Sequence, residues 1–295
     1  MRFDEVVEGV LSRSIVPLTT PDEATWIATW RERRLATEDL DVMAALGGAL
    51  SDRLAWVFLS GYQATIYRCF PGLSRGEGLT SFVNTEDRSG ALPPAALSGE
   101  GGARRLNGWK GWVAASEHVE RLLISARQEQ TPFIVLRRET PGVRIESRES
   151  PSYLPELTQG RVEFVDVEVP DDRLTGDEST FPTFRVGEGA YIRVAFGAFI
   201  LAHARRFDAP STLVADALAA LYAAAGCVRQ PMPSTSSLIA AHAADRAVQR
   251  VLPDLEALLA ERDPELLGRI TRDRRLVTAA SEPLASRAAQ ALHKQ

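Results

Sequence analysis

The run LNGWKGWV at residues 106–113 has the clearest chemical character in the chain, because it places two tryptophans around a lysine and a glycine. The Asn-Gly pair in front of the tryptophans is a turn signal, so we expect a short β segment to carry both indoles. Two indoles on a strand form a flat apolar wall, which can cover an aromatic ligand or close a core. The residue types alone favour the core.

Other reactive side chains are few and scattered. The chain has two cysteines and four histidines, and none of them has the spacing of metal ligands, so no metal site is expected. Cys69 has no histidine near it in sequence, and we expect it to pack as a small apolar residue rather than act as a nucleophile. The stretch from Ser98 to Ala103 has the composition of a phosphate loop, but no helix pattern follows it, which favours a β-turn.

Composition narrows the kind of protein. The 295 residues carry a net charge of −5, and the arginines are mixed with acids, so nucleic acid is not an expected partner. The chain does not open with a basic segment followed by an apolar one, and we expect no apolar run that approaches about 18 residues, the length of a membrane span. These features predict a cytoplasmic protein with no membrane insertion. The two lone cysteines suit a reducing compartment.

Helical patterns dominate residues 1–80. Pro21-Asp22-Glu23 is a helix start, a second helix is expected from about Leu40 to Leu50, and Ser51-Asp52 begins a third, largely buried one. Gly47-Gly48 should weaken the end of the second helix, because a glycine costs about 1 kcal/mol in a helix interior.

Helical periodicity gives way to short strand patterns over residues 81–177. The expected strands are Leu122–Ala126, Phe133–Leu136, Val143–Ile145 and Arg161–Val169. In the last of these the apolar positions change parity between Phe164 and Val165, which indicates a β-bulge or a kink. Strands this short and numerous predict a small barrel or sandwich.

Residues 178–295 return to helix. We expect helices over about 185–206, from Pro210, from Ser234 to about Leu252 and from near Pro264, with a break at Pro253. They predict an antiparallel bundle with short connections. The chain is therefore expected to be a multidomain α+β protein with a helical N-terminal domain (1–80), a β domain (81–177) and a C-terminal helical bundle (178–295).

This order of segments resembles that of the acyl-CoA dehydrogenase family, and motifs across residues 81–177 carry the resemblance. The matching segments are Thr85-Glu86, Leu106-Asn107-Gly108 followed by Lys110 and Trp112, Ser125-Ala126-Arg127, Pro141-Gly142-Val143 and Val162–Pro170. Arg272-Asp273 resembles an Arg-Asp pair near the family's last helices. Both helical ends are short for the family.

The resemblance implies a flavoprotein that dehydrogenates an acyl thioester of CoA or of a carrier protein. In the family, FAD lies between the β domain and the bundle, and a glutamate removes the α-proton while a hydride passes to the flavin. Thr85 matches the threonine that hydrogen-bonds the flavin edge, and Trp112 matches the aromatic residue beside the ring. Trp109, three positions before Trp112, is then expected on the opposite face of the strand, in packing.

The chain departs from the family pattern at several cofactor positions. Ala114 replaces the threonine that reaches the flavin. Arg205 begins a segment that only partly matches the family's pyrophosphate-contacting corner, and the Gly-Gly loop for the adenosine half is missing. For the base, Glu188 lies close to one of the family's two base positions and Glu282 lies near the other. Each glutamate can instead be a helix-end carboxylate stabilised by the macrodipole.

Three functions stay open at this point. The chain can be an FAD-dependent dehydrogenase, a degenerate or half-site subunit paired with a longer homologous chain, or a flavin-free fold that binds a thioester for proton-only chemistry. Ala114 and the missing loop motivate the second possibility. The family also implies self-association as a homo-oligomer.

Overall fold

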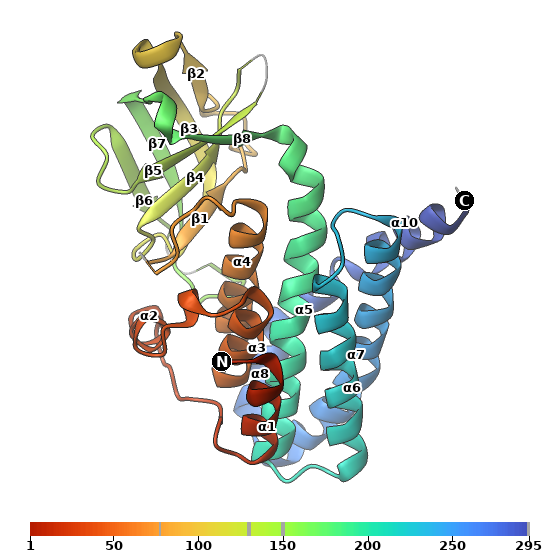
Figure 1. Cartoon of the computed structure of the whole chain (residues 1–295). Helices are drawn as coiled ribbons and strands as arrows, with labels where there is room; N and C mark the ends of the chain where they lie inside the picture. Colours follow the sequence, from red (N-terminus) through yellow and green to blue (C-terminus); the bar gives the residue numbers. More distant parts are fainter. Residues whose placement is uncertain (77, 129–130, 149–150, 294–295) are drawn as a thin grey trace. The chain divides into compact units, whose positions relative to one another are not determined.

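The computed structural model describes residues 1–76, 78–128, 131–148 and 151–293. The chain forms two compact units (Figure 1). A helical unit contains Met1–Pro21, Glu32–Arg68 and Pro182–Gln295, and a β unit contains Asp22–Arg31 and Cys69–Phe181. The mixed α+β architecture expected from the sequence is confirmed. The division into three domains stays a prediction, since most of the N-terminal helical segment groups here with the C-terminal helices.

The helical unit is built around long, largely buried helices. Its helices are α1 (Phe3–Leu11), α3 (Leu40–Leu50), α4 (Leu54–Cys69), α5 (Phe181–Arg206), α6 (Ser211–Val228), α7 (Thr235–Arg262), α8 (Pro264–Asp273), α9 (Arg275–Thr278) and α10 (Ser281–His293). Figure 1 shows α5, α6 and α7 side by side. Contrary to the expected break, α7 continues through Pro253. This proline is exposed, so water can replace the backbone hydrogen bond that it removes.

Two glycines set how closely the N-terminal helices approach α5. A Cβ on Gly48 of α3 would lie 1.9 Å from the carbonyl oxygen of Ala195, and a Cβ on Gly61 of α4 would lie 2.6 Å from the backbone of Ile192. Only glycine fits at such contacts. Gly48 therefore allows α3 to pack against α5, a role that its low helix propensity does not reveal.

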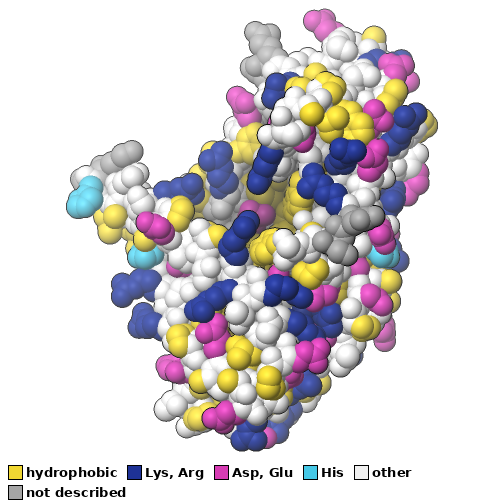
Figure 2. Space-filling model, turned by 180° about the vertical axis from the view of Figure 1, so that it is seen from behind, with side chains coloured by type: hydrophobic (Ala, Val, Ile, Leu, Met, Phe, Trp, Pro, Cys, Tyr) yellow, Lys and Arg dark blue, Asp and Glu magenta, His cyan; other side chains and the backbone are white. Residues whose placement is uncertain are grey.

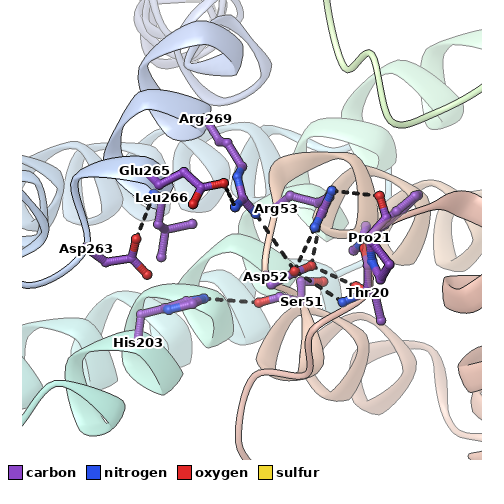
Figure 3. A network of polar contacts seen from close by, with 11 residues as sticks. Thr20, Pro21, Ser51, Asp52, Arg53, His203, Asp263, Glu265, Leu266 and Arg269 are labelled. Carbon is purple, nitrogen blue, oxygen red and sulfur yellow. Dashed lines mark hydrogen bonds and ion pairs between the residues drawn. The ribbon is translucent and has the colours of Figure 1, made fainter.

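A polar network fixes the turn between α3 and α4 (Figure 3). Asp52 accepts hydrogen bonds from Thr20 Oγ1 at 2.7 Å and from Arg53 Nη2 at 2.8 Å. Arg269 of α8 lies 3.9 Å from the same carboxylate. Burial pushes the pKa of Asp52 up, but the hydrogen bonds from Arg53 and Thr20 together outweigh burial and lower it. The charged carboxylate thus ties three separate segments of the helical unit together.

The β unit is a sandwich of two four-stranded sheets, with strand orders β1-β4-β5-β8 and β2-β3-β7-β6. The strands are β1 (Thr80–Val83), β2 (Ala96–Ser98), β3 (Arg105–Ala114), β4 (Arg121–Ser125), β5 (Pro132–Arg137), β6 (Val143–Ser147), β7 (Gln159–Glu168) and β8 (Leu174–Asp177). Val83 and Ile124 of one sheet and Leu106, Val162 and Phe164 of the other share one buried core. The predicted strands are thus present, with ends shifted by a few residues.

Local irregularities in the β unit follow the sequence signals. Gly101–Ala103 forms a single 3-10 turn, and β3 rather than a helix follows it. In β7 the register against β3 shifts between the pairs Leu106–Val167 and Gly108–Phe164, and Asp166 has a positive φ of 49°. The parity change along the sequence therefore marks a real β-bulge.

Helix α2 (Glu23–Glu32) is fastened to the β unit through Glu23, which is only 3% exposed. Its carboxylate accepts a hydrogen bond from the Thr158 amide at 2.6 Å and lies 2.6 Å from His118 Nδ1. Burial raises the pKa of Glu23 despite these contacts. Trp26 and Trp30 of the same helix are both buried, which agrees with their expected common face.

Helix α6 is long and apolar enough to cross a membrane by length and composition, the one such helix within the described part of the chain. Its mean hydropathy of 1.6 over 18 residues corrects the expectation that no apolar run approaches that length, and 44% of the helix is buried. Buried helices of globular proteins have the same composition, so the cytoplasmic location stays a prediction.

Acidic and basic side chains both occur across the face of the molecule in Figure 2.

Candidate functional site

The structure brings Thr85 and the second tryptophan of the 106–113 run together in the β unit. The Gly111 amide donates a hydrogen bond to the Thr85 carbonyl at 2.7 Å, and Trp112 follows directly on β3. A Cβ on Gly111 would lie 2.6 Å from the Glu86 carbonyl oxygen, so glycine is required at this contact. Thr85 and Trp112 are both partly exposed.

A second bulge, in β3, changes the predicted orientation of the tryptophans. The register against β7 shifts between the pairs Lys110–Val162 and Val113–Gly160, so one extra residue separates Trp109 from Trp112. The Trp112 indole donates to Gln159 Oε1 at 3.2 Å.

Both indoles therefore contact residues on one face of β7. The Arg161 guanidinium lies 5.0 Å from the Trp109 ring centre, and Gln159 and Arg161 both point away from the core that holds Val162. The expectation that Trp109 faces the core is wrong, because the bulge breaks the alternation on which it depended.

Ala114 is buried, and its amide donates to Ser81 Oγ at 2.9 Å. The predicted flavin-side position therefore offers no side-chain hydroxyl, and its backbone donor already has a partner in β1. Thr85 differs, since its hydroxyl has no hydrogen-bond partner among the residues that the structure describes. One predicted cofactor residue thus keeps a free polar group and the other does not.

A buried lysine, Lys110, lies on β3 directly before Gly111, the residue whose amide binds the Thr85 carbonyl. Lys110 is 2% exposed, and its ammonium donates to Glu86 Oε1 at 2.9 Å and to Ser125 Oγ at 3.1 Å. Ser125 in turn donates to Asn84 Oδ1 at 2.9 Å. Burial lowers the pKa of Lys110, while the hydrogen bond to Glu86 opposes that change. In the sequence, Lys110 is visible only as a lysine at a core-facing position of a strand. Its hydrogen bonds to Glu86 and Ser125 are seen only in the structure.

In the helical unit, Glu188 is the glutamate with the environment of a general base. It lies in α5 next to Gly187, which approaches Thr65 of α4. Burial raises the pKa of its carboxyl to about 7. Across residues 1–76, 78–128, 131–148 and 151–293, this carboxyl has neither a hydrogen-bond nor an ion-pair partner. Glu188 is half-buried, and a desolvated carboxyl without a partner is costly. Such groups cluster at functional sites.

Glu282 has a different environment. It is exposed in the first turn of α10, where a carboxylate is stabilised by the positive end of the helix dipole. The preceding Ser281 donates to Asp245 at 3.0 Å, and Asp245 also accepts from Arg193 Nε at 2.9 Å. Asp245 of α7, which is also bound by Arg193 of α5, therefore positions the start of α10, while Glu282 itself is exposed.

Arg205 lies at the other end of α5, about 26 Å along the axis from Glu188 at 1.5 Å per residue. Its guanidinium donates to the Leu11 carbonyl at 2.8 and 3.1 Å. Leu11 ends α1, so Arg205 satisfies a helix-terminal carbonyl. Its expected contact with a pyrophosphate stays a prediction, and this structural contact is an alternative use for the side chain.

The residues of the β unit fit an aromatic cofactor better than a metal. Within the described ranges, no three histidine, cysteine, aspartate or glutamate side chains gather as a metal site. A partly exposed indole beside an uncommitted threonine hydroxyl suits the face and edge of a flat heteroaromatic ring. FAD is therefore compatible with Thr85 and Trp112, whereas Ala114 contributes only shape.

Comparison with solved structures defines the class: the chain has the fold of acyl-CoA dehydrogenase-like proteins. PigA bound to FAD and proline is 12% identical with a TM-score of 0.67, over 99% of each chain. A structure assigned as an acyl-CoA dehydrogenase from Mycobacterium smegmatis is 17% identical with a TM-score of 0.61, over 99% of this chain and 98% of that one. The prolyl acyl carrier protein oxidase AnaB is 14% identical with a TM-score of 0.66, over 98% and 97%.

No protein-family model matches the sequence, and no curated protein matches it. At identities of 12–17% the structural likeness shows the fold alone, because one fold supports many chemistries. The function therefore has to be argued from the residues described above.

Proposed function

We propose that this protein is an FAD-dependent dehydrogenase of an acyl thioester carried by CoA or by a carrier protein. The observation that carries the proposal is Glu188, whose desolvated carboxyl has a pKa of about 7 and no partner among the described residues. A general base works best when its pKa lies near the working pH. The acyl-CoA dehydrogenase-like fold supports the same chemistry by analogy.

The chain's own residues have distinct roles in this proposal. Thr85 hydrogen-bonds the edge of the cofactor through its free hydroxyl, and Trp112 packs beside the ring. Bound FAD would supply the acceptor for the hydride that leaves the β-carbon of the substrate. Glu188 accepts the α-proton, so a double bond forms between the two carbons while the carboxyl becomes neutral. Burial favours that neutral product, which makes Glu188 a stronger base than an exposed glutamate.

The choice between CoA and carrier protein is part of the proposal. PigA is seen with FAD and proline, and AnaB is described as an oxidase of a prolyl carrier protein. These neighbours favour including carrier-protein thioesters among the test substrates. Self-association as a homo-oligomer and a cytoplasmic location belong to the same proposal.

A visible absorption spectrum of the purified protein tests the proposal directly. The protein should be yellow, or become so with added FAD, and an acyl thioester should bleach the flavin band in the absence of oxygen. Parallel additions of CoA and carrier-protein thioesters identify the carrier. Colourless protein that takes up no added FAD would falsify the proposal.

Ala114 favours a second candidate, a half-site subunit that works only with a longer homologous chain. The flavin-side position lacks a hydroxyl, and its amide is already bonded to Ser81, so part of the cofactor contact has to come from elsewhere. Co-purification with such a chain, and turnover only in the mixture, would support this candidate. An active homo-oligomer would exclude it, and turnover of a thioester by flavin-free protein would instead favour proton-only chemistry.

A further inference from the structure

Lys110 contacts the residues on both sides of Thr85 in the β unit, one directly and one through a serine hydroxyl. Its ammonium reaches Glu86, one residue after Thr85, at 2.9 Å, and Ser125 at 3.1 Å. Ser125 donates to Asn84, one residue before Thr85, at 2.9 Å. Both neighbours of Thr85 are therefore held, directly or through one hydroxyl, by one buried charge.

The backbone beside Lys110 holds Thr85 from a third direction. The Gly111 amide donates to the Thr85 carbonyl at 2.7 Å, and the Gly111 carbonyl accepts from Arg148 Nη2 at 2.7 Å. Gly111 lies in the β3 bulge that turns Trp112 toward Gln159. The contacts that fix Thr85 therefore also fix the backbone that presents Trp112.

A lysine at this position has no role in the apolar core other than through these partners. Lys110 pairs in register with Val162, a core residue, and lies between Leu106 and Val113 on the same face. An apolar side chain would fill the space without the cost of desolvating a charge. An ion pair with a buried member is weak evidence for a stabilising role, which leaves the orientation of its partners as the function to test.

We propose that Lys110 is a positioning residue that holds Thr85 and Trp112 in one fixed arrangement for the edge and the face of the flavin. This inference rests on the proposed function for its ligand, but the arrangement itself can be measured without one. Lys110 touches neither the cofactor nor the substrate in this proposal. It acts through Glu86, Ser125 and the Gly111 peptide.

The test compares two double variants of matched chemistry. Lys110→Met with Glu86→Gln removes the buried ammonium and its half-buried partner carboxylate at similar volume, a change that proteins often tolerate. Arg144→Met with Glu163→Gln removes an ion pair of 3.4 Å on the outer face of the same sheet, where Arg144 is 67% exposed. Ser125→Ala is a milder third variant, which keeps the ion pair and removes the link to Asn84.

Two measurements on each protein decide the inference. Hydrogen exchange of the Gly111 amide reports the contact with Thr85, with the Val113 amide as a reference for the whole strand. Titration with FAD reports the dissociation constant. In the Lys110/Glu86 variant, Gly111 exchange should rise about tenfold or more relative to Val113, and the FAD dissociation constant should rise by a similar factor. The Arg144/Glu163 variant should match the wild type, and Ser125→Ala should lie between.

The outcomes separate the two proposals. Unchanged Gly111 exchange in a folded Lys110/Glu86 variant, or an equal rise at Val113, overturns the positioning role. Faster Gly111 exchange with an unchanged FAD dissociation constant overturns its link to the cofactor. If the wild type binds no FAD, the proposed function fails, while Gly111 exchange still decides whether Lys110 holds Thr85. If the double variant does not fold, Ser125→Ala decides by the same two measurements.

Discussion

The hydroxyl of Ser81 on β1 accepts a hydrogen bond from the amide of Ala114 on β3 at 2.9 Å, and both residues are buried. This contact joins strands of the two different sheets. It gives the Ala114 amide a side-chain acceptor at the last residue of its strand. The sandwich therefore depends on a side chain where the backbone pattern ends.

Replacing Ser81 by alanine should lower the free energy of unfolding by about 1–3 kcal/mol, because the Ala114 amide is then buried without a partner. Chemical denaturation with an unchanged m-value measures the loss. Ser98→Ala, at an exposed position of β2, is the control and should change stability by less than about 0.5 kcal/mol. A Ser81 variant as stable as this control would mean that water replaces the hydroxyl.

Glu188→Gln should reduce thioester turnover by about 10²–10⁴-fold, because the amide cannot accept a proton, and should leave the FAD dissociation constant unchanged. In the wild type, kcat/KM should rise as the pH passes through about 7, where the Glu188 carboxyl ionises. Steady-state kinetics over pH 5.5–8.5, a range set about the expected pKa, measures both effects. Loss of turnover in Glu282→Gln but not in Glu188→Gln would move the base to Glu282.

The same substitution should stabilise the protein at high pH. Burial raises the pKa of Glu188 to about 7 from its ordinary value of 4.5, so the unfolded chain loses its proton first. Wild-type stability therefore falls as the pH rises between these two values. Glu188→Gln removes this ionisation and should gain on the order of 2–3 kcal/mol over the wild type above pH 7. The two proteins should converge near the lower pKa. Thermal unfolding at several pH values measures the difference, and parallel curves would show that Glu188 is solvated.

Glu23→Ala should loosen α2, because the buried Thr158 amide and His118 lose their shared acceptor. We expect a loss of about 1.5–3 kcal/mol, the usual range for hydrogen bonds to a charged group. Hydrogen exchange of the α2 amides and the fluorescence of the buried Trp26 and Trp30 report the change. Glu32→Ala, exposed at the other end of the helix, is the control. Equal exchange in the two variants would contradict the fastening role.

Glycine-to-alanine substitutions should have opposite effects at Gly48 and Gly226. At Gly48 the new methyl group would overlap the Ala195 carbonyl, and overpacking of this kind costs about 1–3 kcal/mol. At Gly226 in α6 nothing lies within 4 Å of the added Cβ, so the higher helix propensity of alanine should add about 0.5–1 kcal/mol. Denaturation midpoints of the two variants show whether each substitution raises or lowers the stability of the protein. A stabilised Gly48→Ala protein would show that α3 can move away from α5.

The sequence by itself determined the order of the helical and β segments and the type of many of their elements. Alternating apolar residues located β4, β5, β6 and β7, and the parity change at Phe164 and Val165 predicted the bulge in β7. These features follow from the side-chain periods of strands and helices, which are local properties. The motifs near Thr85 and Trp112 also pointed to the fold that the comparisons show.

Only the tertiary structure decided which side chains share an environment. Trp109 and Trp112 lie on one face because of a bulge that has no parity signal in the sequence, and Glu188 differs from Glu282 only through the packing around it. The proposed positioning role of Lys110 depends on hydrogen bonds to Glu86 and Ser125, which are 24 and 15 residues away in the sequence. Desolvation and hydrogen-bond partners arise from contacts between distant segments, so a linear pattern supplies the residue types and the fold sets their chemistry.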